Sequence, residues 1–445
     1  MNLKDLTFDG HWYTSFPSLN HWGPLDHKEY SERLRSFLNG GNSAHLYLHI
    51  PFCAKLCYYC ICNIVVTNER EKIRFFLDHL LKEIDLLKGI YDEVGLNPDI
   101  RDLQFGGGTP SHLSQEEFGL LCSKLNTLSP LMGMDEVAME IDPRTVKQED
   151  LLFYYEHGVN RISFGIQDFD PQVQKAINRE QPFEMVRDLL SGVRDKLSVN
   201  FDLLYGLPLQ THETIAKTIE QVVELSPDRI TLLKYCHAPE VKKHMKLIKE
   251  EDLPIELAEM FVNIVDELQR KGYQWIGLDH FAKPTDELTL AQINGTVHRT
   301  FNGFTPGRTK DMIGLGPTTT GAFGTMYAQA QYDLHEYYNS INRDEFPVFR
   351  GYKLNYDDTL RREVIFSLLC QQRVDFRHYG NYFNRELTLL EGSDLCTLKD
   401  GVLQVTKEGR YKLRNLCKVF DNKDVKPEHK KISQFPITRK VKLVA

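Results

Sequence analysis

Short apolar segments recur along the first half of the chain and are separated by longer amphipathic stretches. Apolar runs of this length are typical of buried parallel strands, and the stretches between them, such as residues 71–88 and 114–128, have the composition of helices. The alternation predicts an α/β fold, either a barrel or an open sheet, in which ligands collect at the C-terminal ends of the strands. The six predicted strands are residues 46–50, 102–105, 137–141, 161–166, 199–204 and 229–233.

The pattern changes after about residue 350. Residues 360–370 and 408–420 have helical periodicity, with a short apolar run at 401–405 between them. We therefore expect three parts: an N-terminal segment that covers the active site (1–45), a barrel domain (46–350), and a mostly helical C-terminal domain (351–445) with a mobile tail from residue 421.

Composition excludes several classes of protein. The chain has 445 residues, 41% of them hydrophobic, which is enough for a sizeable core. Its net charge of −8 provides no general basic field, so we expect no nucleic-acid partner and no anionic membrane partner. No apolar stretch is long enough to span a bilayer and the first residues lack a signal core, so we expect a cytoplasmic protein with reduced thiols.

Four cysteines, Cys53, Cys57, Cys60 and Cys62, fall within ten residues. The first three have the spacing CxxxCxxC. Thiolates are the usual ligands of iron–sulfur clusters, and three of them leave the fourth iron of a cubane open to another molecule. Structural zinc usually takes two separated pairs of ligands, and a disulfide needs an oxidising compartment. A single crowded loop therefore favours an iron–sulfur cluster.

Polar or glycine-rich residues follow the predicted strands. A Gly-Gly-Gly-Thr-Pro run at 106–110 follows the second strand, and Glu140, Gln167 and Asp202 lie at or near the ends of the third, fourth and fifth. Each could cap a helix or satisfy a turn, which is the commoner role for one such residue. Their recurrence at successive strands favours a shared cavity. Arg179 offers a fixed cation, although an arginine beside Glu180 is more often a solvated ion pair.

A later segment carries further cationic or titratable groups: His280, His298, Arg299 and Arg308. Taken singly, a histidine of this kind is more often a hydrogen-bonded core or surface group.

These motifs together resemble the radical S-adenosylmethionine (SAM) enzymes, whose cysteine loop is similar to Cys53-Ala-Lys-Leu-Cys57-Tyr-Tyr-Cys60. More narrowly, nearly the whole chain resembles the family of oxygen-independent coproporphyrinogen III oxidases, also called coproporphyrinogen dehydrogenases. The residues that carry this resemblance are Tyr-Thr-Ser-Phe-Pro at 13–17, Tyr47 before His-Ile-Pro-Phe-Cys, the glycine run, Gln-Asp-Phe at 167–169, Asn-Arg-Glu-Gln at 178–181, Asp-Leu-Leu-Tyr-Gly-Leu-Pro at 202–208, Asp-His-Phe-Ala at 279–282 and Tyr-Ala-Gln at 327–329.

The resemblance implies an incomplete TIM-like (β/α)6 barrel in which Cys53, Cys57 and Cys60 ligate a [4Fe–4S] cluster, with one SAM on the open iron. It implies a second SAM close to the first. The implied contacts of one SAM are Tyr47, Gly107, Glu140 and Thr320, and those of the other are Tyr59, Gly108, Thr109, Gln167, Arg179, Asp202 and Cys236.

The resemblance also implies the reaction. A radical SAM oxidoreductase of this family cleaves SAM to a 5′-deoxyadenosyl radical, which takes hydrogen from a propionate side chain. Loss of CO₂ and one electron then leaves a vinyl group, and two such conversions turn coproporphyrinogen III into protoporphyrinogen IX in haem biosynthesis. Cys62 is then a candidate catalytic residue for a later electron or proton step. The implied partners are a tetrapyrrole substrate and a reduced flavodoxin- or ferredoxin-type electron donor, and we expect a monomer.

Three places depart from the family pattern. Trp12 stands where the family usually has Arg, Cys236 where it commonly has Ala, and Thr320 ends a Pro-Thr-Thr-Thr stretch that is usually more apolar. Two alternatives therefore stay open: a paralogue that methylates or opens another tetrapyrrole, and a non-catalytic haem chaperone. The chaperones generally lack the cysteine at position 62, which favours the enzyme. Arg299, Arg308 and Lys310 are candidates for binding the substrate propionates.

Overall fold

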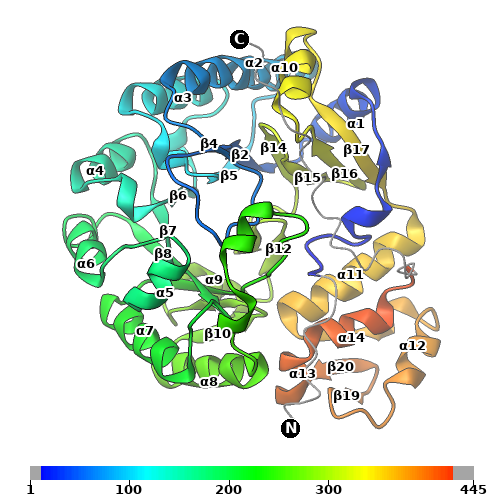
Figure 1. The fold of residues 1–445 in the computed structure, drawn as a ribbon. Coiled ribbons are helices and arrows are strands. Elements are labelled where there is room, and N and C mark those ends of the chain that lie inside the picture. Colours follow the sequence, from blue (N-terminus) through cyan, green and yellow to red (C-terminus); the bar gives the residue numbers. More distant parts are fainter. Residues whose placement is uncertain (1–11, 424–445) are drawn as a thin grey trace.

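Six parallel strands form the centre of the molecule, and each contains one of the predicted segments (Figure 1). The computed structural model describes residues 12–423. The predicted partial barrel of strands and helices is confirmed. In spatial order the strands are β2 (Ala44–Ile50), β5 (Ile100–Gly107), β6 (Glu136–Ile141), β7 (Arg161–Gln167), β8 (Ser198–Tyr205) and β9 (Arg229–Lys234).

Shorter strands extend this sheet at both ends, so it has thirteen strands in the described part of the chain. Beyond β2 lies β14 (Met312–Leu315), which is parallel to β2. An antiparallel series follows: β15 (Thr320–Phe323), β16 (Met326–Ala330), β17 (Val348–Lys353) and β1 (Gly23–Pro24). Beyond β9 lie β11 (His280–Ala282) and β10 (Gln274–Gly277), both antiparallel to their neighbours.

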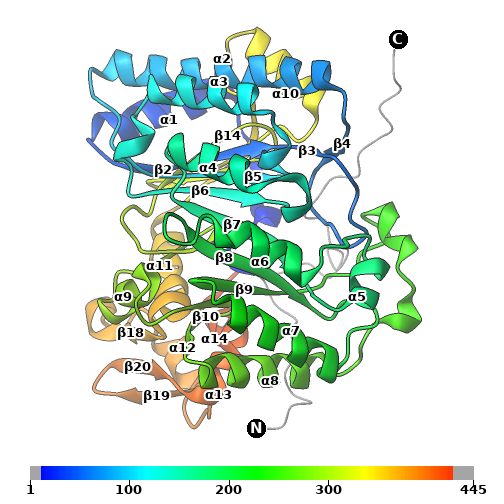
Figure 2. The same cartoon turned by 90° about the vertical axis from the view of Figure 1, so that its left-hand side faces the viewer.

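Helices cover the outer face of the parallel strands (Figure 2). The helices predicted at residues 71–88 and 114–128 are both present, but their ends differ from the prediction. The first helix extends to Val94, and the second ends at Asn126. Ser114 caps the second helix in a capping box with Glu117, which fixes its start. The helices of this layer are α2 (Arg70–Val94), α3 (Gln115–Asn126), α4 (Gln148–Glu156), α5 (Pro171–Ala176), α6 (Phe183–Ser191), α7 (His212–Leu225) and α8 (Leu257–Arg270).

The parallel strands alternate between an apolar outer face and a polar inner face. Phe105 pairs with Met139 on the neighbouring strand, and both are fully buried in the main core. The intervening positions, such as Gln104, Glu140 and Ser163, line a cavity inside the barrel. Because successive strand residues point to opposite faces, one set of positions holds the helices while the other builds the site.

Ion pairs cross the N-terminal ends of the strands. Glu136 at the start of β6 pairs with Arg161 of β7 at 2.9 Å and with Arg229 of β9 at 3.0 Å. Arg308 pairs with Asp102 of β5 at 2.6 Å. These buried charges occur as matched pairs, as burial of charge requires.

The chain after residue 353 packs beside the β9–β11 end of the barrel and shares a core with the N-terminal segment (Figure 1). Tyr13 and Phe16 belong to the same buried cluster as Leu278 and Phe420. The predicted helix at 408–420 is two helices that meet at Lys412. This region contains α11 (Tyr356–Gln371), α12 (Asn384–Leu389), α13 (Lys407–Tyr411), α14 (Leu413–Phe420) and a small sheet of β18 (Arg373–Asp375), β19 (Cys396–Lys399) and β20 (Val402–Val405).

The domain boundaries at 45/46 and 350/351 stay predictions, and most of the predicted tail lies outside the described residues. The remaining elements are α1 (His27–Asn39), α9 (Glu287–Ile293), α10 (Leu334–Asn342), β3 (Phe52–Cys53), β4 (Val65–Val66), β12 (His298–Thr300) and β13 (Gly303–Thr305). Short 3-10 helices occupy Leu19–His21, Pro110–His112, Leu131–Gly133, Pro143–Thr145, Lys243–Leu247, Glu250–Asp252 and Phe376–Tyr379.

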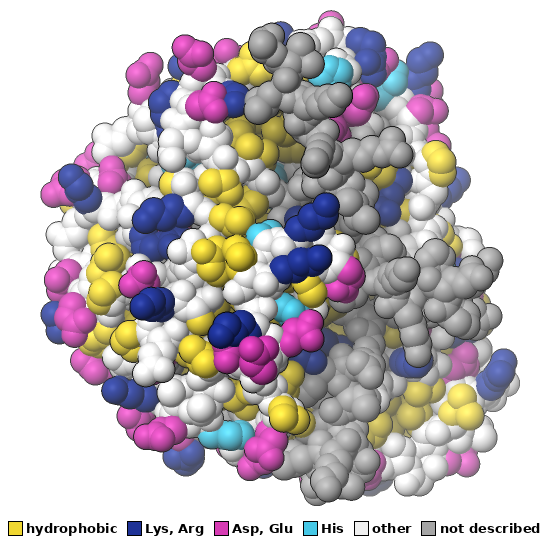
Figure 3. Space-filling view, in the orientation of Figure 1, with side chains coloured by type: hydrophobic (Ala, Val, Ile, Leu, Met, Phe, Trp, Pro, Cys, Tyr) yellow, Lys and Arg dark blue, Asp and Glu magenta, His cyan; other side chains and the backbone are white. Residues whose placement is uncertain are grey.

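Within residues 12–423, no helix has the length and apolar character needed to cross a membrane. Acidic and basic side chains are interspersed over the face of the barrel in Figure 3.

Candidate active site

A cavity of about 1540 Å³ extends through the barrel from the C-terminal ends of the parallel strands to residues such as Glu136 and Arg229 at their N-terminal ends. The cysteine loop, the strand ends, residues 299–305 and part of the N-terminal segment contribute to its walls. Of the predicted site residues, Tyr47 and Thr320 are absent from the described lining. Those that line the cavity are Cys53, Cys57, Cys60, Cys62, Tyr59, Gly107, Gly108, Thr109, Glu140, Gln167, Arg179, Asp202 and Cys236.

Side chains from distant parts of the chain fix the cysteine loop. Asn178 Nδ2 donates a hydrogen bond to the carbonyl oxygen of Leu56 at 2.7 Å, and His244 Nε2 donates to that of Cys60 at 2.8 Å. Asn178 has a φ of 56°, in the left-handed region that Asn tolerates better than most residues. These two hydrogen bonds position the loop from both sides.

Three donors point at the cysteine sulfurs. Arg144 Nη2 and Arg179 Nη1 lie 3.3 and 3.5 Å from Cys57 Sγ, and Thr109 Oγ1 lies 3.3 Å from Cys53 Sγ. Guanidinium groups stabilise thiolate rather than thiol, and hydrogen bonds to sulfur tune an iron–sulfur cluster. The residues present therefore fit an anionic cluster held by thiolates.

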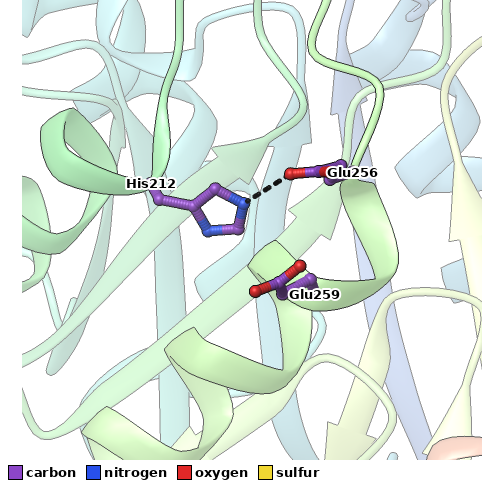
Figure 4. Close-up of side chains that lie close together, drawn as sticks. All are labelled: His212, Glu256 and Glu259. Atoms are coloured by element: carbon purple, nitrogen blue, oxygen red, sulfur yellow. Dashed lines mark ion pairs between the residues drawn. The ribbon is translucent and has the colours of Figure 1, made fainter. Parts of the chain in front are cut away.

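A second group of possible metal ligands lies away from the cysteine loop and is not part of the described cavity lining. Among the described residues, one group, formed by His212, Glu256 and Glu259, brings three possible ligand atoms within 4.8 Å of one another (Figure 4). Glu256 and Glu259 are exposed, and exposed acidic groups of this kind are common without a metal ion.

The glycine run brings the end of β5 against the cysteine loop. A Cβ on Gly108 would lie 2.8 Å from the carbonyl oxygen of Phe52, and Gly107 has a φ of 113°. A side chain at position 108 would collide with the cysteine loop, and the positive φ at position 107 disfavours any residue other than glycine. The run thus packs tightly against the cysteine loop, and its contact with a ligand stays a prediction.

Glu140 and Asp202 are neighbouring carboxylates on the inner face. Gln104 Nε2 and the Gly107 N–H donate to Glu140 at 3.0 and 3.2 Å. Burial and the nearby charge of Asp202 raise the pKa of Glu140 to about 7. Asp202 accepts hydrogen bonds from Ser163 at 2.7 Å and from Asn200 at 2.8 Å. Both groups are thus held as polar acceptors facing the cavity.

Arg179 is a buried site residue rather than a solvated partner of Glu180. It is 6% exposed and donates to the Gly165 carbonyl oxygen from Nε at 2.9 Å and from Nη2 at 2.7 Å. Its Nη1 also lies 3.2 Å from Asp142 Oδ2. Gln167 ends the same strand with a φ of 65°. The Asn-Arg-Glu-Gln motif therefore joins the cysteine loop to the end of β7.

The remaining predicted residues lie in different settings. Cys62 is exposed on the cavity wall, and its carbonyl oxygen accepts a bond from Lys242 Nζ at 2.7 Å. The side chains of Tyr47 and Glu140 both lie against Gly106, where an added Cβ would contact each of them. Thr320 starts β15.

The three residues predicted to bind the substrate propionates lie in different places in the structure. Arg299 lines the cavity. Arg308 is engaged by Asp102 and Glu287 at the other end of the barrel, so it is not available for a propionate. Lys310 is not part of the described lining.

Sequence reasoning missed several polar residues that support the predicted ones. Arg144 bonds to Cys57 and lies directly after the Glu-Ile-Asp-Pro motif at 140–143, so its position next to a motif was an available signal. Gln104, Ser163 and Asn200 occupy inward positions in otherwise apolar strands, and the period-two pattern of a strand could have indicated them.

Comparison with known proteins defines the class. The profile of the radical SAM superfamily matches residues 47–222, which hold the cysteine loop and four of the six parallel strands in full. The fold and the thiol loop are therefore those of a radical SAM protein.

Full-length relatives define the family. The oxygen-independent coproporphyrinogen III oxidase of Escherichia coli is 35% identical over 441 residues, with 94% of each chain covered. That of Pseudomonas aeruginosa is 36% identical over 440 residues, again with 94% coverage of each chain. The solved structure of the E. coli coproporphyrinogen III oxidase, described as a radical SAM enzyme, matches with a TM-score of 0.86 and covers 92% of this chain and 97% of that one. The chain belongs to the family of oxygen-independent coproporphyrinogen III oxidases. Membership of the radical SAM superfamily implies a [4Fe–4S] cluster and SAM as cofactors.

Proposed function

We propose that this protein decarboxylates two propionate side chains of coproporphyrinogen III oxidatively, without oxygen, and so forms protoporphyrinogen IX for haem biosynthesis. The observation that carries the proposal is one cavity lined by the three cysteines and by polar residues from successive parallel strands. Full-length identity of about 35% to oxygen-independent coproporphyrinogen III oxidases supports it.

The cofactors and the chain divide the work between them. When bound, the reduced cluster and SAM supply a 5′-deoxyadenosyl radical that removes a hydrogen atom from the propionate. The chain's part is to hold Cys53, Cys57 and Cys60 as thiolates and to bring the substrate beside them. Loss of CO₂ and of one electron to an acceptor completes each vinyl group, so no side chain has to act as a strong acid or base. Cys62, on the cavity wall, is the candidate for a later electron or proton step.

We further propose two SAM molecules in the cavity. Gly107 and Glu140 would contact one, with Tyr47 behind Glu140 and Thr320 on the neighbouring strand series. The other would lie between Tyr59 and the ends of β5, β7, β8 and β9, in contact with Gly108, Thr109, Gln167, Arg179, Asp202 and Cys236. Equilibrium dialysis with labelled SAM on cluster-loaded protein should give two molecules per chain, and a single molecule would contradict this part of the proposal.

The remaining predictions concern partners and location. A reduced flavodoxin- or ferredoxin-type protein as electron donor, a monomeric state and a cytoplasmic location all stay proposals. The nine cysteines all lie within the described residues and form no disulfide there, which is compatible with a reducing compartment.

Anaerobic product analysis tests the reaction. Reconstituted, reduced protein is incubated with SAM and coproporphyrinogen III, and the tetrapyrroles are separated by chromatography and identified by mass spectrometry. We expect the masses of the mono- and divinyl products. A tetrapyrrole that gains a methyl group together with S-adenosylhomocysteine would indicate a methyltransferase. Stoichiometric haem binding without any 5′-deoxyadenosine would indicate a chaperone.

A further inference from the structure

One buried cation in the cavity wall has no adequate partner. Arg299 lies on β12, is 4% exposed and lines the cavity. Among residues 12–423, its Nε and Nη1 atoms are buried without a hydrogen bond. The nearest carboxylate is Asp279, 3.7 Å from Nη1, which is beyond hydrogen-bond distance. The guanidinium carbon lies 4.8 Å from the centre of the Phe304 ring.

The surrounding charges do not balance. Asp279 is already engaged by His280, whose Nδ1 lies 2.6 Å from its Oδ1. Although burial opposes ionisation, His280, Arg299 and Arg414 together hold the pKa of Asp279 well below its usual range, so it contributes one full negative charge. Two arginines therefore share one carboxylate. Lys418 also contributes to the cavity wall and adds to the positive excess.

Arg414 reaches this place from the C-terminal region. It lies on α14, and its guanidinium carbon is 3.9 Å from the centre of the Trp12 ring. Trp12 lines the cavity. The guanidinium that α14 supplies is therefore held against a ring of the N-terminal segment at the cavity wall. A stacked Arg–Trp pair is a common cation–π arrangement.

We propose that Arg299 binds a carboxylate of the tetrapyrrole substrate, and that Arg414, held by Trp12, adds the second positive charge of this subsite. An unpaired buried charge is costly, and a planar guanidinium with free N–H groups is suited to bidentate binding of a carboxylate. The inference rests on the proposed function, because it takes the ligand to be a tetrapyrrole with acidic side chains. In this subsite, one propionate is held while another reacts.

Binding of two porphyrins to anaerobic, cluster-loaded protein tests the subsite. Coproporphyrin III, the stable oxidised analogue, carries four carboxylates, and its tetramethyl ester carries none. Arg299→Gln should weaken binding of coproporphyrin III by about thirtyfold or more, which is the range for loss of one partner of a buried charge pair, and leave binding of the ester unchanged. Arg299→Lys keeps the charge and should lose less affinity. Arg343→Gln, an exposed arginine on the outer surface, is the matched control for net charge.

The outcomes separate the two proposals. If Arg299→Gln and Arg343→Gln both bind coproporphyrin III within twofold of the wild type, the subsite is wrong while the proposed function stands. An equal loss of affinity for the acid and the ester would also overturn it, because it would indicate a packing role. If Arg299→Gln does not fold, Arg299→Lys and Arg414→Gln carry the test, and an unchanged acid-to-ester preference in both would overturn the subsite. If the wild type binds neither porphyrin, the proposed substrate fails and the subsite fails with it.

Discussion

Individual side chains control the charge of the cysteine loop. Arg144 and Arg179 both reach Cys57 Sγ, and Asp142 bridges the two guanidinium groups. The Cys loop motif and Arg179 could be predicted from the sequence because each lies inside a recognisable pattern. Arg414 could not, because it reaches the cavity through the packing of α14 against the N-terminal segment, and no local pattern encodes that contact.

Replacing Arg144 by Gln should weaken the cluster site. The variant removes a positively charged donor 3.3 Å from Cys57 Sγ, so we expect a more negative cluster reduction potential and faster loss of iron in air. Potentiometric titration and iron and sulfide analysis measure the two effects. Arg101→Gln removes an exposed, paired arginine of the same size and serves as the control. Equal potentials and equal iron retention in the two variants would contradict the assignment.

Glu83 should make stability depend on pH. It is 1% exposed, and burial raises its pKa to about 7 despite hydrogen bonds from Tyr337 at 2.7 Å and the Gly316 N–H at 2.8 Å. Between the ordinary pKa of a glutamate and 7, the folded state keeps a proton that the unfolded state has released. Its contribution to stability therefore falls as pH rises and is lowest above pH 7.

The variant Glu83→Gln removes this titration. The free energy of unfolding of this variant, relative to that of the wild type, should increase as the pH rises from 5 to 8. The increase should be at most on the order of 3 kcal/mol. Thermal unfolding midpoints of both proteins across this range measure the difference. A difference between the two unfolding midpoints that stays constant with pH would show that Glu83 does not titrate in this way.

Among the helices and strands, the six parallel strands could be predicted from the sequence, whereas the shorter strands that extend the sheet could not. The six core strands are buried on both sides or carry long apolar runs, which the sequence displays directly. Strands β14, β15 and β17 contain glycines, and β14 and β17 depend on pairing with β2 and β1, which lie far away in the chain. The single predicted helix at 408–420 breaks at Lys412 because α13 and α14 pack against different neighbours.

The capping box of α3 offers a local test. Ser114 Oγ accepts from the Glu117 N–H at 3.2 Å, and Glu117 Oε2 accepts from the Ser114 N–H at 2.8 Å. Ser114→Ala should destabilise the first turn of α3 by about 1 kcal/mol, because one helix N–H loses its partner. Hydrogen exchange followed by mass spectrometry should show faster exchange there, with cofactor content unchanged. Ser123→Ala, later in the same helix, should not reproduce this, and equal effects would argue against the cap.

At the scale of the whole molecule, one cavity runs through the barrel. Paired charges such as Glu136 and Arg229 line it at the N-terminal ends of the strands, and the cysteine loop lines it at the C-terminal ends. The N-terminal segment and the C-terminal helices share one core beside that cavity, so both ends of the chain contribute to the site. Sequence motifs locate the site at the strand ends, whereas the wall formed by Arg299, Arg414 and Trp12 depends on this long-range packing.

Transfer of one hydrogen atom from the substrate to 5′-deoxyadenosine tests the proposed reaction most directly. Coproporphyrinogen III deuterated on the propionate carbons next to the ring is incubated anaerobically with SAM, reductant and the cluster-loaded protein. We expect each 5′-deoxyadenosine to gain one deuterium and the tetrapyrrole to lose two CO₂ units. Deuterium-free 5′-deoxyadenosine beside intact coproporphyrinogen would contradict the proposed function, because the radical would then act on something other than the propionates.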